Sequence, residues 1–315
     1  MRLEMGTFPV REIVFGSHTR WSDGLLEVCR EDLIEAVADD PRIKKVELEL
    51  TNPGDSTRIW PVRDVVEPRI KVRGPGTVYP GICGRPITTV GEGRTHRLSG
   101  MGVVEVSETP WHESGGDHLF IYQDMSGPWA ELIPQSSLIS LCVVVEADPA
   151  LGVDARNDAV HNAVLTVSDL LAAATIELEP PEMEVFELKE GDPSLQNVVY
   201  IQCLHSPQAM SGSQSTFCTS TYGLTQLTPP WLFHPNEILD GAITGPYRTA
   251  FANSWTVANN PLLLDLYRRQ GIDFNFVGVI ATRTEWTTQQ EKEMTANQTA
   301  KLAKMLGAQG ALVTW

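Results

Sequence analysis

Side chains that can do chemistry gather in a few short segments of the sequence, and the first of these surrounds His96. This histidine lies in Gly93-Arg-Thr-His-Arg-Leu-Ser-Gly100, where the flanking glycines indicate a loop that closely approaches another group. A neutral imidazole could act there as a base or a metal ligand, or it could fix the loop through hydrogen bonds to the backbone. Arg94 and Arg97 could hold a carboxylate. We take His96 as a candidate catalytic residue and both arginines as candidate substrate-binding residues.

A second segment, residues 111–118, has ligand types that zinc, iron and manganese prefer. His112, Glu113 and His118 are the candidate ligands of a divalent metal ion, and Asp117 lies beside them. Two glycines interrupt the segment, and adjacent ligands do not point from one face of a helix or strand. The spacing therefore favours a polar surface turn, and a metal site is the alternative.

Carboxylates and an imidazole also occur in turn-like segments next to expected strands. Asp124 begins Asp-Met-Ser-Gly-Pro, whereas His234, Glu237 and Asp240 share a later block. A carboxylate near an imidazole can do general acid and base work, so Asp124 is a second candidate catalytic residue. His234 and Glu237 are candidate substrate-binding residues. Alternatively, Asp124 and Asp240 only cap turns by bonding the backbone.

The thiols offer a nucleophilic alternative. The five cysteines are widely spaced and form no Cys-x-x-Cys pair, so we expect reduced thiols rather than disulfides or a zinc ribbon. Cys203 lies in an apolar strand and is expected to be inert, whereas Cys218 lies in a Ser/Thr-rich loop and is the third candidate catalytic residue. The sequence has no Gly-x-Ser-x-Gly elbow, phosphate-binding loop or dinucleotide fingerprint.

Composition limits the class of protein. The chain has 315 residues, of which 42% are hydrophobic, and its net charge of −16 disfavours general nucleic-acid binding. It shows neither a signal-peptide pattern nor an apolar run long enough to span a membrane, so we expect a cytoplasmic protein. Residues 58–97 differ in charge from the chain as a whole, because they contain eight basic and three acidic side chains. They predict either a solvated face that pairs with acidic neighbours or a surface that attracts an anionic substrate or an acidic partner.

The pattern of strands and helices predicts a mixed α/β fold with two domains. Residues 1–150 are expected to form a β-rich domain, and residues 151–315 an α/β domain. From residue 261 onward, helix, strand, helix and strand follow one another, which implies parallel pairing with right-handed crossovers. The expected strands are 11–16, 46–51, 69–73, 102–106, 119–123, 138–145, 197–202, 241–245, 274–281 and 311–315; the expected helices are 31–38, 158–178, 262–270 and 289–306, with a linker at 179–193.

Several longer blocks occur in a fixed order along nearly the whole chain. Two of them are Asp124-Met-Ser-Gly-Pro and His234-Pro-Asn-Glu-Ile-Leu-Asp-Gly-Ala-Ile. The others are residues 1–6, 58–72, 93–100, 259–261 and 274–280. Together these blocks resemble the component B precursor of glycine/sarcosine/betaine reductase. Ordered, gap-free blocks are far more specific than one short motif.

The resemblance implies a subunit that binds a small nitrogen-containing substrate for C–N bond cleavage in a multi-subunit reductase. In that family an internal cysteine becomes an N-terminal pyruvoyl group, which can form a Schiff base with an amino substrate. A second subunit carries a selenocysteine or cysteine nucleophile, and further components supply electrons. The resemblance therefore implies a hetero-oligomer whose partner resembles that second subunit.

The sequence departs from the family pattern in two respects. The pyruvoyl-forming cysteine should lie between the block that ends at Ile243 and Asn259, but residues 244–258 contain none. Thr249 falls about where it belongs, and Ser254 aligns poorly with that position. The sequence thus argues against a pyruvoyl group. Family precursors also continue beyond the strand that here ends at Trp315, so we expect a truncated homologue whose missing half lies on another polypeptide or is not needed. Two alternatives stay open: a metal- or cysteine-dependent hydrolase or lyase subunit, and a non-catalytic scaffolding subunit.

Overall fold

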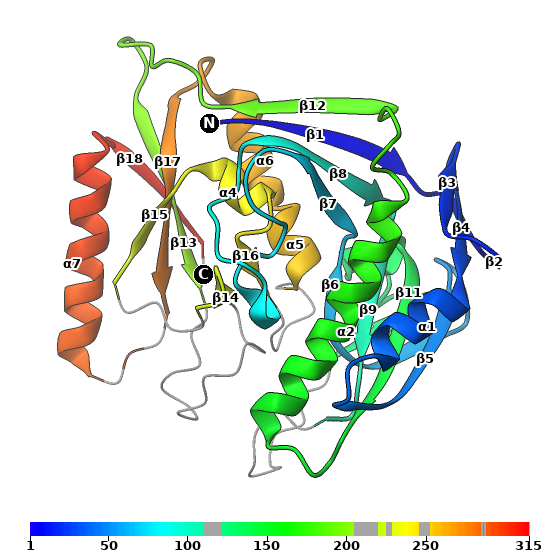
Figure 1. Ribbon diagram of the computed structural model, residues 1–315. Coiled ribbons are helices and arrows are strands. Elements are labelled where there is room, and N and C mark those ends of the chain that lie inside the picture. The colour runs from blue at the N-terminus through cyan, green and yellow to red at the C-terminus, as the bar shows by residue number, and fades with distance from the viewer. Residues whose placement is uncertain are drawn as a thin grey trace.

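The computed structural model describes residues 1–109, 121–204, 220–224, 229–245, 253–284, 286 and 288–314. Its sheets contain both parallel and antiparallel pairs, and helices pack against them (Figure 1). The mixed α/β fold that the sequence predicts is thus confirmed. Of the helices described, none combines the length and the apolarity that a membrane crossing requires.

One sheet forms the centre of the first half of the chain. In spatial order it contains β10 (Ile121–Asp124), β6 (Arg58–Val66), β9 (Met101–Val106), β11 (Ile139–Ala147) and β5 (Ile43–Thr51). β11 is an apolar run without alternation, which agrees with its place between two other strands. Helix α2 (Val153–Ala173) packs against β11 and β9, and α1 (Arg30–Ala38) packs against β5. A large apolar core fills the space between these helices and the sheet.

A second sheet combines strands from the first half with a later segment. In spatial order it contains β12 (Glu182–Glu187), β1 (Arg2–Pro9), β8 (Gly93–Ser99) and β7 (Arg69–Arg73). β1 pairs in parallel with β8 and antiparallel with β12. The linker predicted for residues 179–193 is therefore wrong for 182–187, because these residues pair with β1 and bury Phe186. The loop predicted around His96 is also wrong, because His96 lies within β8.

The sheet near the end of the chain has the predicted parallel strands. In spatial order it contains β15 (Trp231–Phe233), β17 (Asn275–Arg283), β13 (Asn197–Leu204) and β18 (Gly310–Thr314), and β13 pairs in parallel with both neighbours. Helix α6 (Pro261–Arg269) begins after Asn260, whose side chain accepts bonds from two backbone amides of its first turn. Helix α7 (Gln289–Met305) begins with a capping box of Thr288 and Glu291 and packs against β17.

Short elements complete the fold and connect its parts. They are β2 (Glu12–Gly16), β3 (Arg20–Ser22), β4 (Leu25–Cys29), β14 (Ser220–Thr221), β16 (Ile243–Thr244), α4 (Pro235–Leu239), α5 (Ser254–Ala258) and the 3-10 turns η1 (Ile82–Gly84) and η2 (Pro134–Ser137). Helix α5 packs against both β16 and β6 and so connects the two halves of the chain. The domain boundary predicted at residue 150 stays a prediction.

Two glycines allow the halves to meet through their backbones. Gly81 and Gly223 have φ values of +75° and +79°. A Cβ atom on Gly81 would lie 2.3 Å from the carbonyl oxygen of Tyr222, and one on Gly223 would lie 2.2 Å from that of Gly81. Since only glycine permits both this conformation and this approach, the crossing fixes the segment around η1 against the segment that precedes α4.

Candidate functional site

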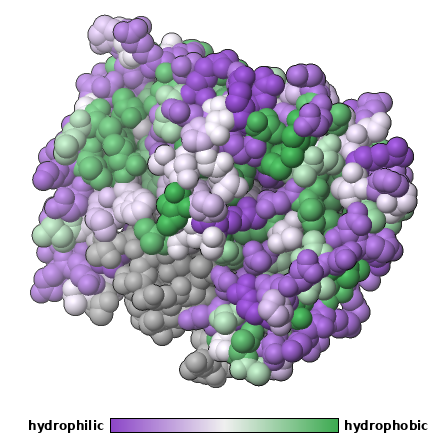
Figure 2. Space-filling model, viewed as in Figure 1, coloured by the Kyte–Doolittle hydropathy of each residue, from purple (hydrophilic) through white to green (hydrophobic). Residues whose placement is uncertain are grey.

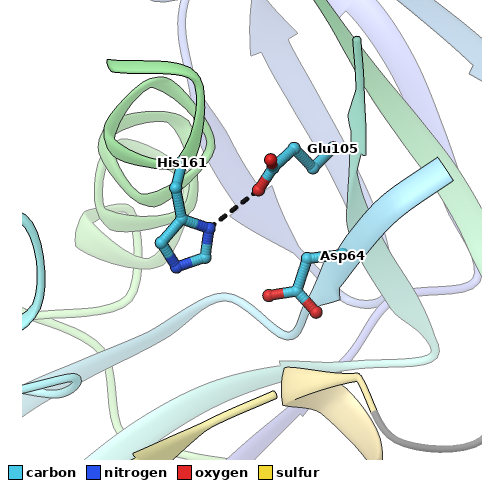
Figure 3. A group of neighbouring side chains, drawn as sticks. All are labelled: Asp64, Glu105 and His161. Atoms are coloured by element: carbon cyan, nitrogen blue, oxygen red, sulfur yellow. Dashed lines mark hydrogen bonds and ion pairs between the residues drawn. The ribbon is translucent and has the colours of Figure 1, made fainter. Parts of the chain in front are cut away.

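A cluster of charged and polar side chains lies fully inside the molecule, where β6, β9, α2 and α5 meet. We call it the buried polar site. None of its side chains is more than 1% exposed. Three of them converge from three different elements (Figure 3). The site consists of Arg63 and Asp64 from β6, Glu105 from β9, Asn157 and His161 from α2, and Ser254 from α5.

A bulge in β6 brings two adjacent side chains into this site. In a regular strand, Arg63 and Asp64 would point to opposite faces of the sheet. The pairing of β6 with β9 shifts register between Val62 and Asp64, so that β6 has an extra residue opposite β9. Asp64 pairs with Glu105 in this register, and Arg63 also reaches the Glu105 carboxylate.

Glu105 is the centre of the contacts. One carboxylate oxygen lies 2.7 Å from Nδ1 of His161, and the other lies 3.2 Å from Nε of Arg63. Arg63 also donates to the side-chain oxygen of Asn157 at 2.7 Å and to the backbone oxygen of Thr109 at 2.9 Å. Because Asn157 and His161 are four residues apart on α2, they lie on the same side of that helix.

Ser254 brings the second half of the chain into the site. Its backbone N–H donates to one oxygen of Asp64 at 2.8 Å, and its hydroxyl donates to the other at 2.6 Å. The backbone N–H of Gly245 donates to the same hydroxyl at 3.1 Å. Asn253 precedes Ser254 and accepts from the backbone N–H of Thr256, which starts α5 at this position. The Asp64 carboxylate thus accepts hydrogen bonds from both the backbone N–H and the hydroxyl of Ser254.

Burial and mutual charge shift the proton affinities of the site. Burial raises the pKa of Asp64 to about 6, although the positive charge of His161 opposes the rise. Burial lowers the pKa of His161, but the attraction and hydrogen bond of Glu105 and the attraction of Asp64 together outweigh it, and the net shift is upward. Burial lowers the pKa of Arg63 to about 10, so it stays charged at neutral pH. Asp64 and His161 therefore hold a proton more strongly than the same side chains do in water.

The same cluster could hold either a proton or a metal ion. One ligand atom each from Asp64, Glu105 and His161 lie within 4.8 Å of one another. A transition metal needs about 2.0–2.2 Å to each such ligand, so the three would have to draw closer, and the Arg63 cation beside Glu105 opposes a second cation. A protonated His161 and Arg63 together balance Asp64 and Glu105. A proton therefore fits the site better than a metal ion.

The arginines and the histidine predicted around residue 96 have structural contacts. Arg94 forms an ion pair with Glu4, and Arg97 donates to Thr7, Asn259 and Glu184. Nδ1 of His96 lies 3.0 Å from the backbone oxygen of Thr175. Burial lowers the pKa of His96, which keeps it neutral. These contacts match the backbone-fixing alternative that the sequence left open for His96.

The remaining predicted residues lie apart from the buried polar site. Asp124 is held by Arg58 through bonds of 2.6 and 2.9 Å, which lowers the pKa of Asp124. His234 and Glu237 form the capping box of α4, and burial lowers the pKa of His234 to about 4. Burial raises the pKa of the Cys203 thiol. Four predicted residues, His112, Glu113, His118 and Cys218, lie outside the described residues.

The basic side chains of residues 58–97 are all paired. Every one of the eight forms an ion pair with a carboxylate, as the pairing alternative predicts, but Arg63, Arg69 and Lys71 are buried and so do not belong to a solvated face. The pairs are Arg58–Asp124, Arg63–Glu105, Arg69–Glu67, Lys71–Asp240, Arg73–Glu4, Arg85–Asp169, Arg94–Glu4 and Arg97–Glu184.

Sequence reasoning missed the residues of the buried polar site, although two signals were present. Glu105 is a charged residue within the otherwise apolar strand β9, and a lone carboxylate in such a run must find a partner. Asn157 and His161 recur at helical spacing on the face of α2 that also carries Val160 and Val164. Nothing in the sequence indicates that Ser254 faces Asp64, because 190 positions separate them.

Comparisons with known proteins identify the family of the chain. The sarcosine reductase complex component B subunit alpha of Peptoclostridium acidaminophilum is 36% identical over 100% of this chain and 72% of its own length. The glycine reductase complex component B subunits alpha and beta of Acetoanaerobium sticklandii are 34% identical, again over 100% and 72%. No solved structure matches the chain significantly. The family model for glycine/sarcosine/betaine reductase component B subunits matches residues 1–315, and the chain therefore belongs to this family.

Proposed function

We propose that this chain works as a subunit of a hetero-oligomeric reductase complex, in which it binds a small nitrogen-containing substrate whose C–N bond is cleaved. The observation that carries the proposal is the complete burial of an acid–base site in a chain of this family. Burying two carboxylates, a guanidinium and an imidazole contributes little to stability compared with apolar packing. Buried groups with shifted pKa values are typical of functional sites.

The chemistry of C–N cleavage suits such a site. When the bond breaks, its electron pair stays with the nitrogen. A substrate bound as the neutral amine therefore needs one proton on that nitrogen to leave as a neutral amine, whereas a substrate bound as the ammonium ion already carries it. A group whose pKa lies near neutral pH gives up a proton readily at this moment. The nucleophile is proposed to come from the partner subunit, as a thiolate or selenolate that bonds to the carbon as the nitrogen leaves.

A pyruvoyl group does not fit this chain. Residues 244–258 contain no cysteine, and the backbone N–H and hydroxyl of Ser254 both bond Asp64. Conversion of Ser254 into a pyruvoyl group would remove both donors and leave a buried carboxylate without them.

The surface of the chain is consistent with a partner subunit. The visible face is largely hydrophilic, but hydrophobic groups gather over the sheet that contains β17 and β18 (Figure 2). Leu232, Leu312 and Val313 of this sheet are exposed by 51%, 40% and 61%. Exposed apolar patches of this kind are typical of protein interfaces.

An activity assay of the purified complex tests the proposed function. The chain is purified with its co-encoded neighbours and incubated with dithiothreitol and glycine, sarcosine or betaine. We expect release of ammonia, methylamine or trimethylamine from at least one probe, loss of release when this chain is omitted, and recovery when it is added back. A partner that releases amine equally well alone would contradict catalysis by this chain and would favour the scaffolding alternative.

A further inference from the structure

His161 has one ring nitrogen with a partner and one without. Nδ1 contacts Glu105 at 2.7 Å, whereas Nε2 is buried and has no hydrogen-bond partner among the described residues. Figure 3 shows the ring beside both carboxylates, with Nδ1 toward Glu105. Buried polar atoms are almost always paired in native proteins. The atom that completes the bonding of Nε2 is therefore expected to come from a water molecule or from a bound ligand.

The charges around His161 favour its protonated form. The groups that act most strongly on it are Glu105 from β9 and Asp64 and Arg63 from β6. Burial and Arg63 lower its pKa, but the two carboxylates outweigh them. With a proton on His161, two positive and two negative charges balance inside the protein. Without that proton, one negative charge stays buried and uncompensated, which is costly.

We infer that His161 donates a proton from Nε2 to the leaving nitrogen of the substrate, and that Glu105 is the positioning residue that holds the imidazole ring for this transfer. The inference rests on the proposed function and names the group that performs its acid step. Arg63 contacts the other oxygen of Glu105 and the side chain of Asn157, so it fixes Glu105 relative to α2.

The step balances in atoms and charge. The substrate binds with a neutral amino group. The partner's thiolate or selenolate forms a bond to the substrate carbon while the C–N bond breaks, and the bonding pair stays on the nitrogen. The proton moves from Nε2 to this nitrogen, and His161 becomes a neutral imidazole that water reprotonates. No electron is gained or lost in this step. Trimethylamine, which leaves from a quaternary nitrogen, needs no such proton.

The first test measures the protonation of His161 in the full chain without any substrate. Nitrogen-15 NMR of histidine-labelled protein is recorded across pH, with His161→Gln to assign the signal. We expect both ring nitrogens of His161 to be protonated at pH 7. In Glu105→Gln we expect the titration to move to lower pH by about one pH unit or more, because the main attraction is lost. A neutral imidazole at pH 7, or an unchanged titration in Glu105→Gln, would overturn the inference.

The second test compares leaving groups in the purified complex. His161→Gln should slow amine release from glycine and sarcosine by about 10²–10⁴-fold, but should slow release from betaine much less. His18→Gln, the same change at an exposed histidine, should leave all rates unchanged. The rate of amine release should fall at alkaline pH, where His161 loses its proton. In Glu105→Gln this fall should occur at lower pH. A merely structural role of His161 would lower all three rates equally.

The outcomes separate this inference from the proposed function. If the wild-type complex releases amine from none of the three probes, the proposed function fails, and the donor role falls with it. If the wild-type complex is active but His161→Gln keeps its rates on glycine and sarcosine, only the inference fails. Stoichiometric metal in the wild-type chain that is lost in His161→Gln would also overturn it, because the imidazole would then be a metal ligand.

Discussion

Replacing Arg63 by methionine should lower the free energy of unfolding by about 3–5 kcal/mol. Arg63 is fully buried, and its guanidinium faces Glu105, Asn157 and the backbone oxygen of Thr109. Methionine fills a similar volume but leaves both carboxylates of the site without their permanent counter-charge. Urea unfolding at pH 7, followed by tryptophan fluorescence, measures the change.

Arg58→Met is the matched control, because the same strand carries both arginines. Arg58 forms an ion pair with Asp124, but its side chain is 57% exposed, so water replaces the lost contact. We expect its unfolding midpoint to stay close to that of the wild type. Equal losses of stability in Arg58→Met and Arg63→Met would show that the burial of Arg63 does not determine how much stability its removal costs.

Asp240→Ala should be similarly costly, with a loss of about 3–5 kcal/mol in the free energy of unfolding. Asp240 is fully buried, and its carboxylate accepts from Lys71, Thr95 and the backbone N–H of Gly91, the last at 2.7 Å. The substitution leaves the Lys71 ammonium, of which 5% is exposed, without its counter-charge. Urea unfolding again measures the effect.

The position of Asp240 makes this variant a test of how the halves are joined. Its three partners all belong to the first half of the chain, whereas Asp240 follows α4 in the second half. Asp265→Ala, at an ion pair on the surface of α6, is the control and should change stability by about 0.5 kcal/mol or less. An Asp240→Ala protein as stable as Asp265→Ala would contradict the role of this carboxylate in joining the halves.

Local patterns predicted those elements whose signals lie within a short window. The helices expected at 262–270 and 289–306 and the strand expected at 138–145 correspond to α6, α7 and β11, and each depends on neighbours along the chain. The strands β1, β8 and β12 were not predicted, because their pairing depends on partners far away in the sequence. β12 is acidic and largely exposed, so its composition resembles a linker.

The site was harder to predict than the fold for the same reason. A bulge in β6 turns Arg63 and Asp64 toward one place, and no residue pattern announces it. The carboxylate that holds Ser254 lies 190 positions earlier. The two arginines and the histidine of residues 93–100 were more conspicuous, but in the structure they bond neighbouring side chains and the backbone. The complete burial of its side chains, rather than a sequence motif, distinguishes the buried polar site.

Native mass spectrometry of the protein purified with its co-encoded neighbours tests the central claim most directly. Membership of the reductase family and the exposed apolar side chains predict a hetero-oligomer. The contacts between Ser254 and Asp64 predict that this chain is not cleaved next to Ser254 within the complex. A chain found alone or only with copies of itself would contradict the proposed complex. Cleavage next to Ser254 would contradict the conclusion that the chain carries no pyruvoyl group.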